Sequence, residues 1–60
     1  MPRAQDVVQK FHAGDHVRYY DGRVGVVVGD IFWGPNDHRF IVVFDQGGQE
    51  ECIPCLLTRL

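Results

Sequence analysis

The sequence contains no serine, and apart from its tyrosines its hydroxyl and thiol nucleophiles are limited to one threonine and two cysteines. These absences exclude a Ser–His–Asp hydrolytic site. No apolar run approaches the roughly 18 residues of a membrane span, and the N-terminus has no apolar stretch typical of a secretion signal. We therefore expect a cytoplasmic protein with reduced thiols, no catalytic residues and no cofactor.

A basic excess is also missing. Six lysine and arginine residues stand against eight aspartate and glutamate residues, so the formal net charge is −2. Nucleic-acid-binding proteins usually show an excess or a stripe of basic residues. Folding could still gather Arg18, Arg23 and Arg39 on one face. A nucleic-acid-associated accessory protein therefore remains the alternative to a protein-binding one.

Cysteine is scarce, and its one pair, Cys52 and Cys55, has the spacing Cys-x-x-Cys. A structural zinc site needs four ligands, which one of the three histidines or a second chain would have to complete. A redox role would favour a helix N-terminus in a βαβ unit. We interpret both cysteines as small core residues beside the last turn and predict no metal site.

The chain is short and also contains few reactive side chains. A domain of 60 residues buries only about 60% of the surface that its unfolded chain exposes, so it often needs further support such as oligomerisation. Residues 1–10 are mostly polar and predict a loose arm or a short helix. Residues 11–60 form the single predicted domain.

Valine-rich segments separated by glycine are what the domain does contain. Residues 16–19 alternate polar and apolar side chains, as in a half-buried strand. Asp21-Gly22 then predicts a hairpin with a type I′ turn, and residues 24–28 predict a second strand that 31–33 continue or end. Gly25 and Gly29 predict a close backbone approach or a bulge that lets this strand bend.

The second half of the domain follows the same plan. A loop at 34–37 leads to an apolar third strand at 39–44, and residues 45–48 predict another hairpin turn. A fourth strand covers 49–53. Pro54 then favours a single 3₁₀ turn, because proline cannot donate to a sheet ladder, and residues 58–60 form a short fifth strand.

Five short strands, two glycine-containing hairpins and a proline-led turn describe a small five-stranded SH3-like barrel, an all-β fold. The pattern Phe11-x-x-Gly14-Asp15-x-Val17-Arg18 resembles the opening of SH3-like barrels of the Tudor, KOW and HspQ type. Val42-Val43-Phe44-Asp45-x-Gly47, followed by Ile53-Pro54-x-x-Leu57, resembles their second half. The resemblance implies a fold more than a function, because this scaffold hosts many unrelated roles.

The segment Gly14-Asp-x-Val-Arg18 is also similar to the start of the plasmid-type (type II) dihydrofolate reductases, which are tetramers around a central pore. Their pore is lined by Val-Gln-Ile-Tyr before a proline, and the matching residues here are Glu50-Glu51-Cys52-Ile53. The Gln and Tyr are absent. Two carboxylates at the pore would repel the folate tail and the cofactor phosphates. We do not expect this activity, although the resemblance supports an oligomer.

Aromatic residues give the main functional prediction. Six of the seven concentrate near the ends of predicted strands. Tyr20, Phe32 and Trp33 could form a patch with Asp21 or Asp30 beside it. Such a patch would attract a cation or stack on a proline-rich peptide or an unpaired base, while the alternative is that these rings fill the core. We predict a protein- or peptide-binding patch.

The third predicted strand is apolar on both faces. Phe40, Val42 and Phe44 point one way, whereas Ile41 and Val43 point the other. A strand of a single small sheet normally has one solvent-exposed, polar face. Because the second face of this strand is apolar too, we expect it to be covered either by the N-terminal arm or by another copy of the chain. We predict a homodimer with Ile41 and Val43 in its interface.

Overall fold

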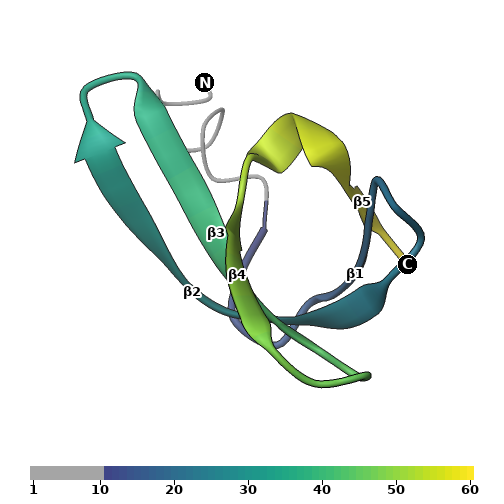
Figure 1. Ribbon diagram of the computed structural model, residues 1–60. Helices are drawn as coiled ribbons and strands as arrows, with labels where there is room; N and C mark the ends of the chain where they lie inside the picture. The colour runs from purple at the N-terminus through teal and green to yellow at the C-terminus, as the bar shows by residue number, and fades with distance from the viewer. Residues whose placement is uncertain (1–10) are drawn as a thin grey trace, which may run out of the picture.

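The computed structural model describes residues 11–60, which form an all-β domain with one short 3₁₀ helix (Figure 1). The predicted fold class is confirmed, whereas the expected arm or helix at residues 1–10 lies outside the described residues. The elements in chain order are β1 (His16–Tyr19), β2 (Val24–Gly34), β3 (Asp37–Phe44), β4 (Gln49–Cys52), η1 (Pro54–Leu56) and β5 (Leu57–Arg59).

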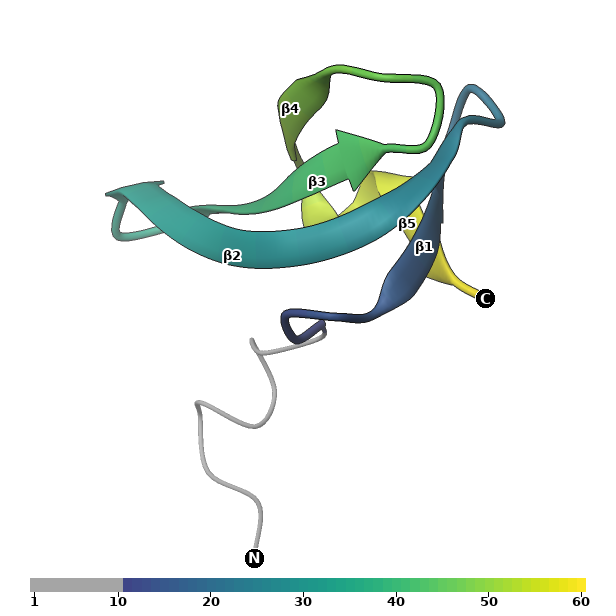
Figure 2. The same ribbon diagram turned by 90° about the horizontal axis from the view of Figure 1, so that it is seen from below.

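All five strands belong to one antiparallel sheet with the order β4-β3-β2-β1-β5. The long strand β2 curves through the middle of the sheet (Figure 2) and carries both β1 and β3 on its edges. The curvature brings β4 and β5 round toward each other with η1 between them (Figure 1). The ladder ends at these two strands, and no pairing joins them within residues 11–60.

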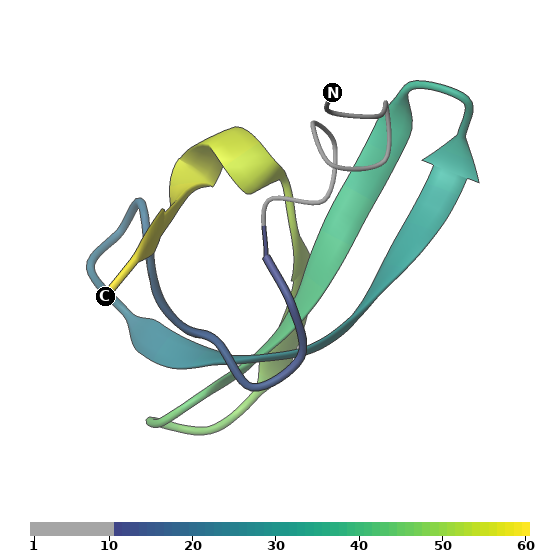
Figure 3. The same ribbon diagram turned by 180° about the vertical axis from the view of Figure 1, so that it is seen from behind.

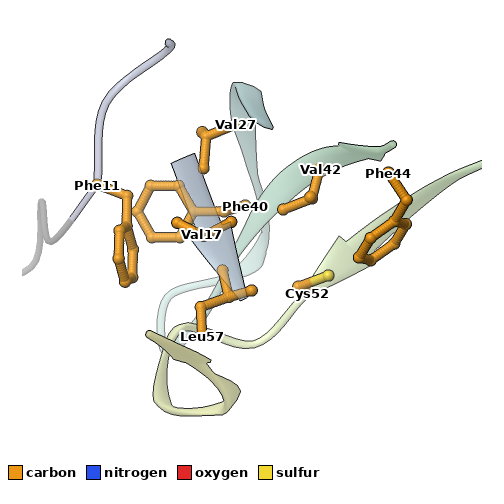
Figure 4. Close-up of a cluster of buried hydrophobic side chains, with 8 residues drawn as sticks. All are labelled: Phe11, Val17, Val27, Phe40, Val42, Phe44, Cys52 and Leu57. Atoms are coloured by element: carbon orange, nitrogen blue, oxygen red, sulfur yellow. The ribbon is translucent and has the colours of Figure 1, made fainter. Parts of the chain in front are cut away.

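The core fills the inner face of this curled sheet. On β3, Phe40, Val42 and Phe44 are almost completely buried, as the predicted alternation requires, and Val43 lies on the outer face with 40% of its surface exposed. Figure 4 shows the core side chains together. The cluster consists of Phe11, Val17, Val27, Phe40, Val42, Phe44, Cys52 and Leu57.

A bulge at Val28 divides β2 into two halves. Val27 pairs with Val42, but the next pair is Gly29 with Ile41, so Val28 is an extra residue. One extra residue exchanges the two faces of a strand. Before the bulge, Gly25 and Val27 are buried; after it, Asp30 pairs with Phe40 and therefore lies on the inner side. The bulge predicted from the glycines is confirmed.

Gly25 is the point where β2 and β3 approach most tightly. A Cβ placed there would overlap the Val43 carbonyl oxygen and would lie 2.8 Å from Cγ1 of Val42 and 2.9 Å from Cα of Phe44. Two of these contacts are with backbone atoms, which cannot move without displacing β3. The predicted close approach is thus confirmed at Gly25.

The first hairpin turn differs from the prediction. The Gly22 amide donates to the Tyr19 carbonyl at 2.9 Å, and Gly22 has φ +97°. No residue other than glycine has positive φ within residues 11–60, so Asp21 cannot occupy a type I′ position. The loop is instead a three-residue turn that ends in a left-handed glycine. Gly47 closes the β3–β4 turn in the same way, donating to Phe44 at 2.9 Å.

Other boundaries shift by a few residues. Strand β2 runs on to Gly34, which pairs with Asp37, so the predicted loop at 34–37 shortens to two residues. Strand β4 ends at Cys52, and η1 begins at Pro54 as expected. No helix among the described residues has the length and apolarity needed to cross a membrane.

We predict that Gly25→Ala destabilises the domain by about 1–3 kcal/mol, because the new methyl group forces β3 away from β2. Denaturant unfolding measures this change. Gly29→Ala is the matched control, since no atom lies within 4 Å of its Cβ position and its φ is not positive. The control should change stability by less than about 0.5 kcal/mol; equal losses in the two variants would contradict the prediction.

Candidate functional site

The residues of the predicted aromatic patch lie in two separate regions. Tyr20 and Asp21 belong to the β1–β2 turn, whereas Asp30, Phe32 and Trp33 lie on the far half of β2. A strand rises roughly 3.3 Å per residue, so Phe32 is about 26 Å along β2 from the start of the strand at Val24. The two regions are at opposite ends of β2 in Figure 1. The structure therefore does not bring the five residues together.

The far half of β2 forms a long hairpin with β3 that extends beyond the curled part of the sheet (Figures 1 and 3). We call residues 29–41 the β2–β3 hairpin. Its end is a two-residue loop, Pro35 and Asn36, between the paired residues Gly34 and Asp37. Two of the largest apolar side chains of the chain, Phe32 and Trp33, are 57% and 59% exposed on this hairpin.

Phe32 lies on the inner side of the hairpin, stacked on His38. The two rings are parallel within 2° and their centroids are 4.1 Å apart. Nε2 of His38 lies 2.7 Å from Oδ2 of Asp30, which fixes the orientation of the imidazole. The stack continues into the core, because His38 contacts Phe40 and Phe40 meets Phe11 edge to face. The exposed ring of Phe32 thus rests on a continuous support.

Trp33 occupies a second irregularity in the ladder, between the pairs of Phe32 and Gly34. Its indole Nε1–H donates to Oε1 of Glu51 at 2.6 Å, which ties the hairpin to β4. Nearby, the guanidinium of Arg39 donates twice to Asp37, at 3.0 and 3.1 Å. Sequence analysis identified the two rings but could not find these partners, since each depends on strand register.

The β1–β2 turn holds a different group, centred on Arg23. Its guanidinium lies over the ring of Phe44, 4.2 Å from the centroid, and 5.6 Å from the centroid of Tyr19. Nε donates to Asp21 at 2.7 Å and Nη2 to Glu50 at 2.8 Å. Hydrogen bonds that the guanidinium donates to Asp21 and Glu50 raise the pKa of Arg23, and a hydrogen bond donated by the Arg23 backbone amide lowers the pKa of Asp21.

Sequence analysis missed Tyr19, Phe44 and Glu50 as neighbours of Arg23. Tyr19 and Phe44 were read as strand residues, and Glu50 as part of a pore-lining segment. The sequence did indicate that the two turns could be neighbours. The β1–β2 and β3–β4 turns both end in a glycine, and alternate hairpin turns of an antiparallel sheet can lie at the same end of the sheet. The register that places Glu50 beside Arg23 cannot be read from the sequence.

The three arginines of the alternative prediction do not form one basic face. Arg23 and Arg39 are each held by carboxylates. Arg18 lies on β1 next to buried Val17 and is exposed, without an ion-pair partner among residues 11–60. Phosphate binding would therefore compete with existing ion pairs at two of the three positions.

Ile41 and Val43 lie on the outer face of β3, as predicted. Val43 pairs with Val26 across the sheet, and Ile41 pairs with Gly29. Val28, the bulge residue, adds a third aliphatic side chain that is more than half exposed. The outer face therefore carries a strip of aliphatic side chains without a formal charge among them.

The segment compared with the reductase pore divides between two faces. Glu50 pairs with buried Val42 and Glu51 pairs with Ile41, so their side chains point in opposite directions. The expectation that both carboxylates would face a pore is therefore wrong for geometric reasons. A shallow depression of about 390 Å³ lies along this edge, and its walls are polar: Arg39, Gln49, Glu50 and Glu51.

The two cysteines have different surroundings. Cys52 is buried in the core, as predicted, whereas Cys55 is exposed on η1. Burial raises the pKa of the Cys52 thiol to about 11, and the nearby Glu50 carboxylate adds to the effect. Within residues 11–60, no group of three or more histidine, cysteine, aspartate or glutamate side chains is placed to hold a metal ion.

No known protein family, curated protein or solved structure gives a significant match to this chain. The superfamily resemblance described above therefore stays a prediction, and the function has to be inferred from the sites themselves.

We predict that only one thiol of the native protein reacts quickly with a disulfide reagent at mildly alkaline pH. Cys55 is accessible, whereas Cys52 is buried and stays protonated because its pKa is raised to about 11. Absorbance of the released chromophore should show one thiol per chain that reacts quickly, and the second thiol should react only after denaturant is added. Cys55→Ala should remove the fast phase; rapid reaction of both native thiols would contradict the prediction.

Proposed function

We propose that this chain is a small non-catalytic binding module, with an SH3-like scaffold, that binds a protein or peptide through the β2–β3 hairpin. The observation that carries the proposal is the exposure of Phe32 and Trp33 on an element that extends from the domain. Large aromatic side chains are the usual anchors of protein interfaces. Each alone could be an ordinary surface residue, but here two consecutive large rings are both more than half exposed on one hairpin.

The hairpin is held in one geometry before any partner arrives. Phe32 is stacked on His38, and Trp33 is hydrogen bonded to Glu51. Two supported rings have less side-chain freedom to lose on association than free rings would have. Such preorganisation increases affinity for a given contact area. The supports therefore favour a recognition role over accidental exposure.

Charge around the rings indicates the chemistry of the partner. Asp30, Asp37 and Glu51 surround the hairpin, and the cationic groups among them are Arg39 and, when protonated, His38. With neutral histidine, three carboxylates face one guanidinium. An apolar segment with flanking lysine or arginine side chains would complement this surface. We infer a basic, apolar peptide as the ligand class.

The same charges argue against nucleic acid as the main ligand. A phosphate backbone would meet the carboxylates of the hairpin, and Arg23 and Arg39 already have anionic partners. Affinity for nucleic acid depends on free cations that release counterions. The reductase alternative has less support still, because Glu51 is engaged by Trp33 at the position of the missing glutamine.

We also propose that the outer face is covered by a second copy of the chain. Val26, Val28, Ile41 and Val43 present an uncharged strip, and a two-fold axis through it would place each strip on its own equivalent. Fully burying an exposed aliphatic side chain contributes roughly 1.5–3 kcal/mol, which is an upper limit for Val28 and Val43, and part-buried Val26 and Ile41 gain less. This gain is useful to a domain whose inner core contains only eight residues.

We predict that peptides selected from a random-peptide phage library on the immobilised protein are apolar and basic, and that their binding depends on the hairpin. Phe32→Ala and Trp33→Ala should each weaken binding of a selected synthetic peptide by at least about ten-fold. Fluorescence anisotropy measures the affinity, and circular dichroism checks that each variant folds. Leu60→Ala is the control, because Leu60 is an apolar residue that is 56% exposed after β5, away from the hairpin.

Two results would contradict this proposal. One is that no selected peptide loses affinity in the hairpin variants. The other is tight binding of a short single-stranded oligonucleotide that weakens steeply with added salt, which is typical of phosphate contacts and would favour the alternative function. Turnover of dihydrofolate with NADPH in a spectrophotometric assay would show that the chain is an enzyme.

For the second copy, we predict that Val43→Glu shifts the solution mass from dimer toward monomer, since two carboxylates would meet across the axis in an apolar contact. Sedimentation equilibrium measures the mass. Thr58→Glu, an exposed position on β5, should leave it unchanged. A monomeric wild-type protein at micromolar concentration would refute the dimer without affecting the hairpin proposal.

A further inference from the structure

The Arg23 group has the composition of a cation-binding site rather than of a simple surface ion pair. We call the four residues around the guanidinium, Tyr19, Asp21, Phe44 and Glu50, the Arg23 site. Phe44 is 97% buried and forms the floor, while Tyr19 is part-buried and forms one wall. Tyr20 packs edge to face on Tyr19 at 4.7 Å and extends that wall into solvent.

Two hairpin turns build this site together. Asp21 and Arg23 come from the β1–β2 turn, whereas Phe44 and Glu50 flank the β3–β4 turn. The Asp45 amide donates to the Val24 carbonyl at 2.9 Å, which fixes one turn beside the other. The walls of the site therefore belong to the sheet and do not depend on the Arg23 side chain for their position.

The geometry matches a guanidinium in particular. The central carbon of the guanidinium lies over the ring of Phe44, 4.2 Å from its centroid, and two different edges, at Nε and Nη2, donate to two separate carboxylates. A guanidinium can stack and donate in its plane at the same time, whereas a compact ammonium has no plane to stack. Two carboxylates also exceed the charge of the one cation, so the site favours cations over neutral groups.

Arg23 reaches this site along a flexible side chain whose surface is 30% exposed. Its removal would break no ladder hydrogen bond, because only the side chain occupies the site. We propose that the Arg23 site is a receptor for an arginine side chain of a peptide, and that Arg23 fills it in cis as a built-in competitor. A tethered ligand acts at an effective concentration in the millimolar range, so an incoming arginine binds only when it outcompetes Arg23.

This inference is independent of the hairpin proposal, since the two regions lie at opposite ends of β2 (Figure 1). Comparing Arg23 with Arg39 isolates the contribution of the aromatic rings. Arg39 has the same Asp-x-Arg spacing as Arg23 and is likewise held by its aspartate, but no ring of the described residues stacks on its guanidinium. Arg39→Ala therefore removes an equivalent ion pair without opening a stacked site.

The test is titration of Arg23→Ala with methylguanidinium chloride, followed by ¹H–¹⁵N NMR, with wild type and Arg39→Ala in parallel. Saturable shifts should appear at residues 19, 21, 44 and 50 of Arg23→Ala, with an affinity at least about ten-fold above that of wild type or Arg39→Ala. Methylammonium chloride, which carries the same charge without the plane, should bind Arg23→Ala several-fold more weakly.

A second variant covers the possibility that Arg23→Ala does not fold. Arg23→Gln keeps two of the three side-chain methylene groups but removes the positive charge, and it should show the same preference for methylguanidinium. The absence of saturable binding to both variants would show that Arg23 is only a structural clamp between two turns. Equal binding to Arg23→Ala and Arg39→Ala would overturn the proposal as well.

Discussion

The bulge at Val28 is the constraint on which the arrangement of this molecule depends. An unbroken strand of eleven residues would keep the same alternation from Val24 to Gly34 and would place Phe32 and Asp30 on the outer face. The extra residue exchanges the faces halfway. The first half of β2 therefore supplies Gly25 and Val27 to the core, and the second half places Phe32 beside His38 on the same side as Phe40.

The small core explains why the hairpin needs side-chain ties of its own. All eight buried hydrophobic residues of the described chain lie on the inner face of the curled sheet or beside it, and none lies between Val27 and Phe40. Among residues 11–60, no second layer of secondary structure packs on the hairpin beyond the bulge (Figure 3). Its geometry depends on three contacts instead: Phe32 on His38, Trp33 with Glu51, and Arg39 with Asp37. Two of these contacts hold the exposed rings, so the same interactions that order the hairpin also shape its surface.

Much of the fold could be predicted because it depends on local sequence. The alternation of residues 16–19 and 40–44, the proline at the start of η1 and the glycines at the bends all act within a few residues. The type of the first turn was misjudged because Asp-Gly suits two kinds of hairpin loop, and only the length of the loop separates them. The end of β2 was left open at residues 31–33: Ile31 and Phe32 pair with β3 and the strand runs on to Gly34, beyond the core, where burial gives no pattern.

The candidate sites were harder to predict because they depend on register. Tyr20 and Phe32 are close enough in sequence to suggest one patch, but most of the long strand β2 lies between them and places the rings at opposite ends. Conversely, Arg23 and Glu50 are far apart in sequence and meet at 2.8 Å. Composition pointed to aromatic rings and carboxylates as candidate site residues, whereas only strand pairing could distribute them between two regions.

The two Asp-x-Arg units of the chain show that neighbouring strands determine the environment of each guanidinium. In both units the side chains two residues apart meet, so local geometry alone makes each ion pair. Exposed pairs of this kind contribute little to stability, because water solvates the separated charges almost as well. Around Arg23, however, Phe44 and Tyr19 replace water on one face, and Glu50 adds a second carboxylate from another strand. The same local sequence thus gives a surface ion pair on the hairpin and, between the turns, a guanidinium that lies over an aromatic ring and donates to two carboxylates, and the difference comes from what β1, β3 and β4 place beside it.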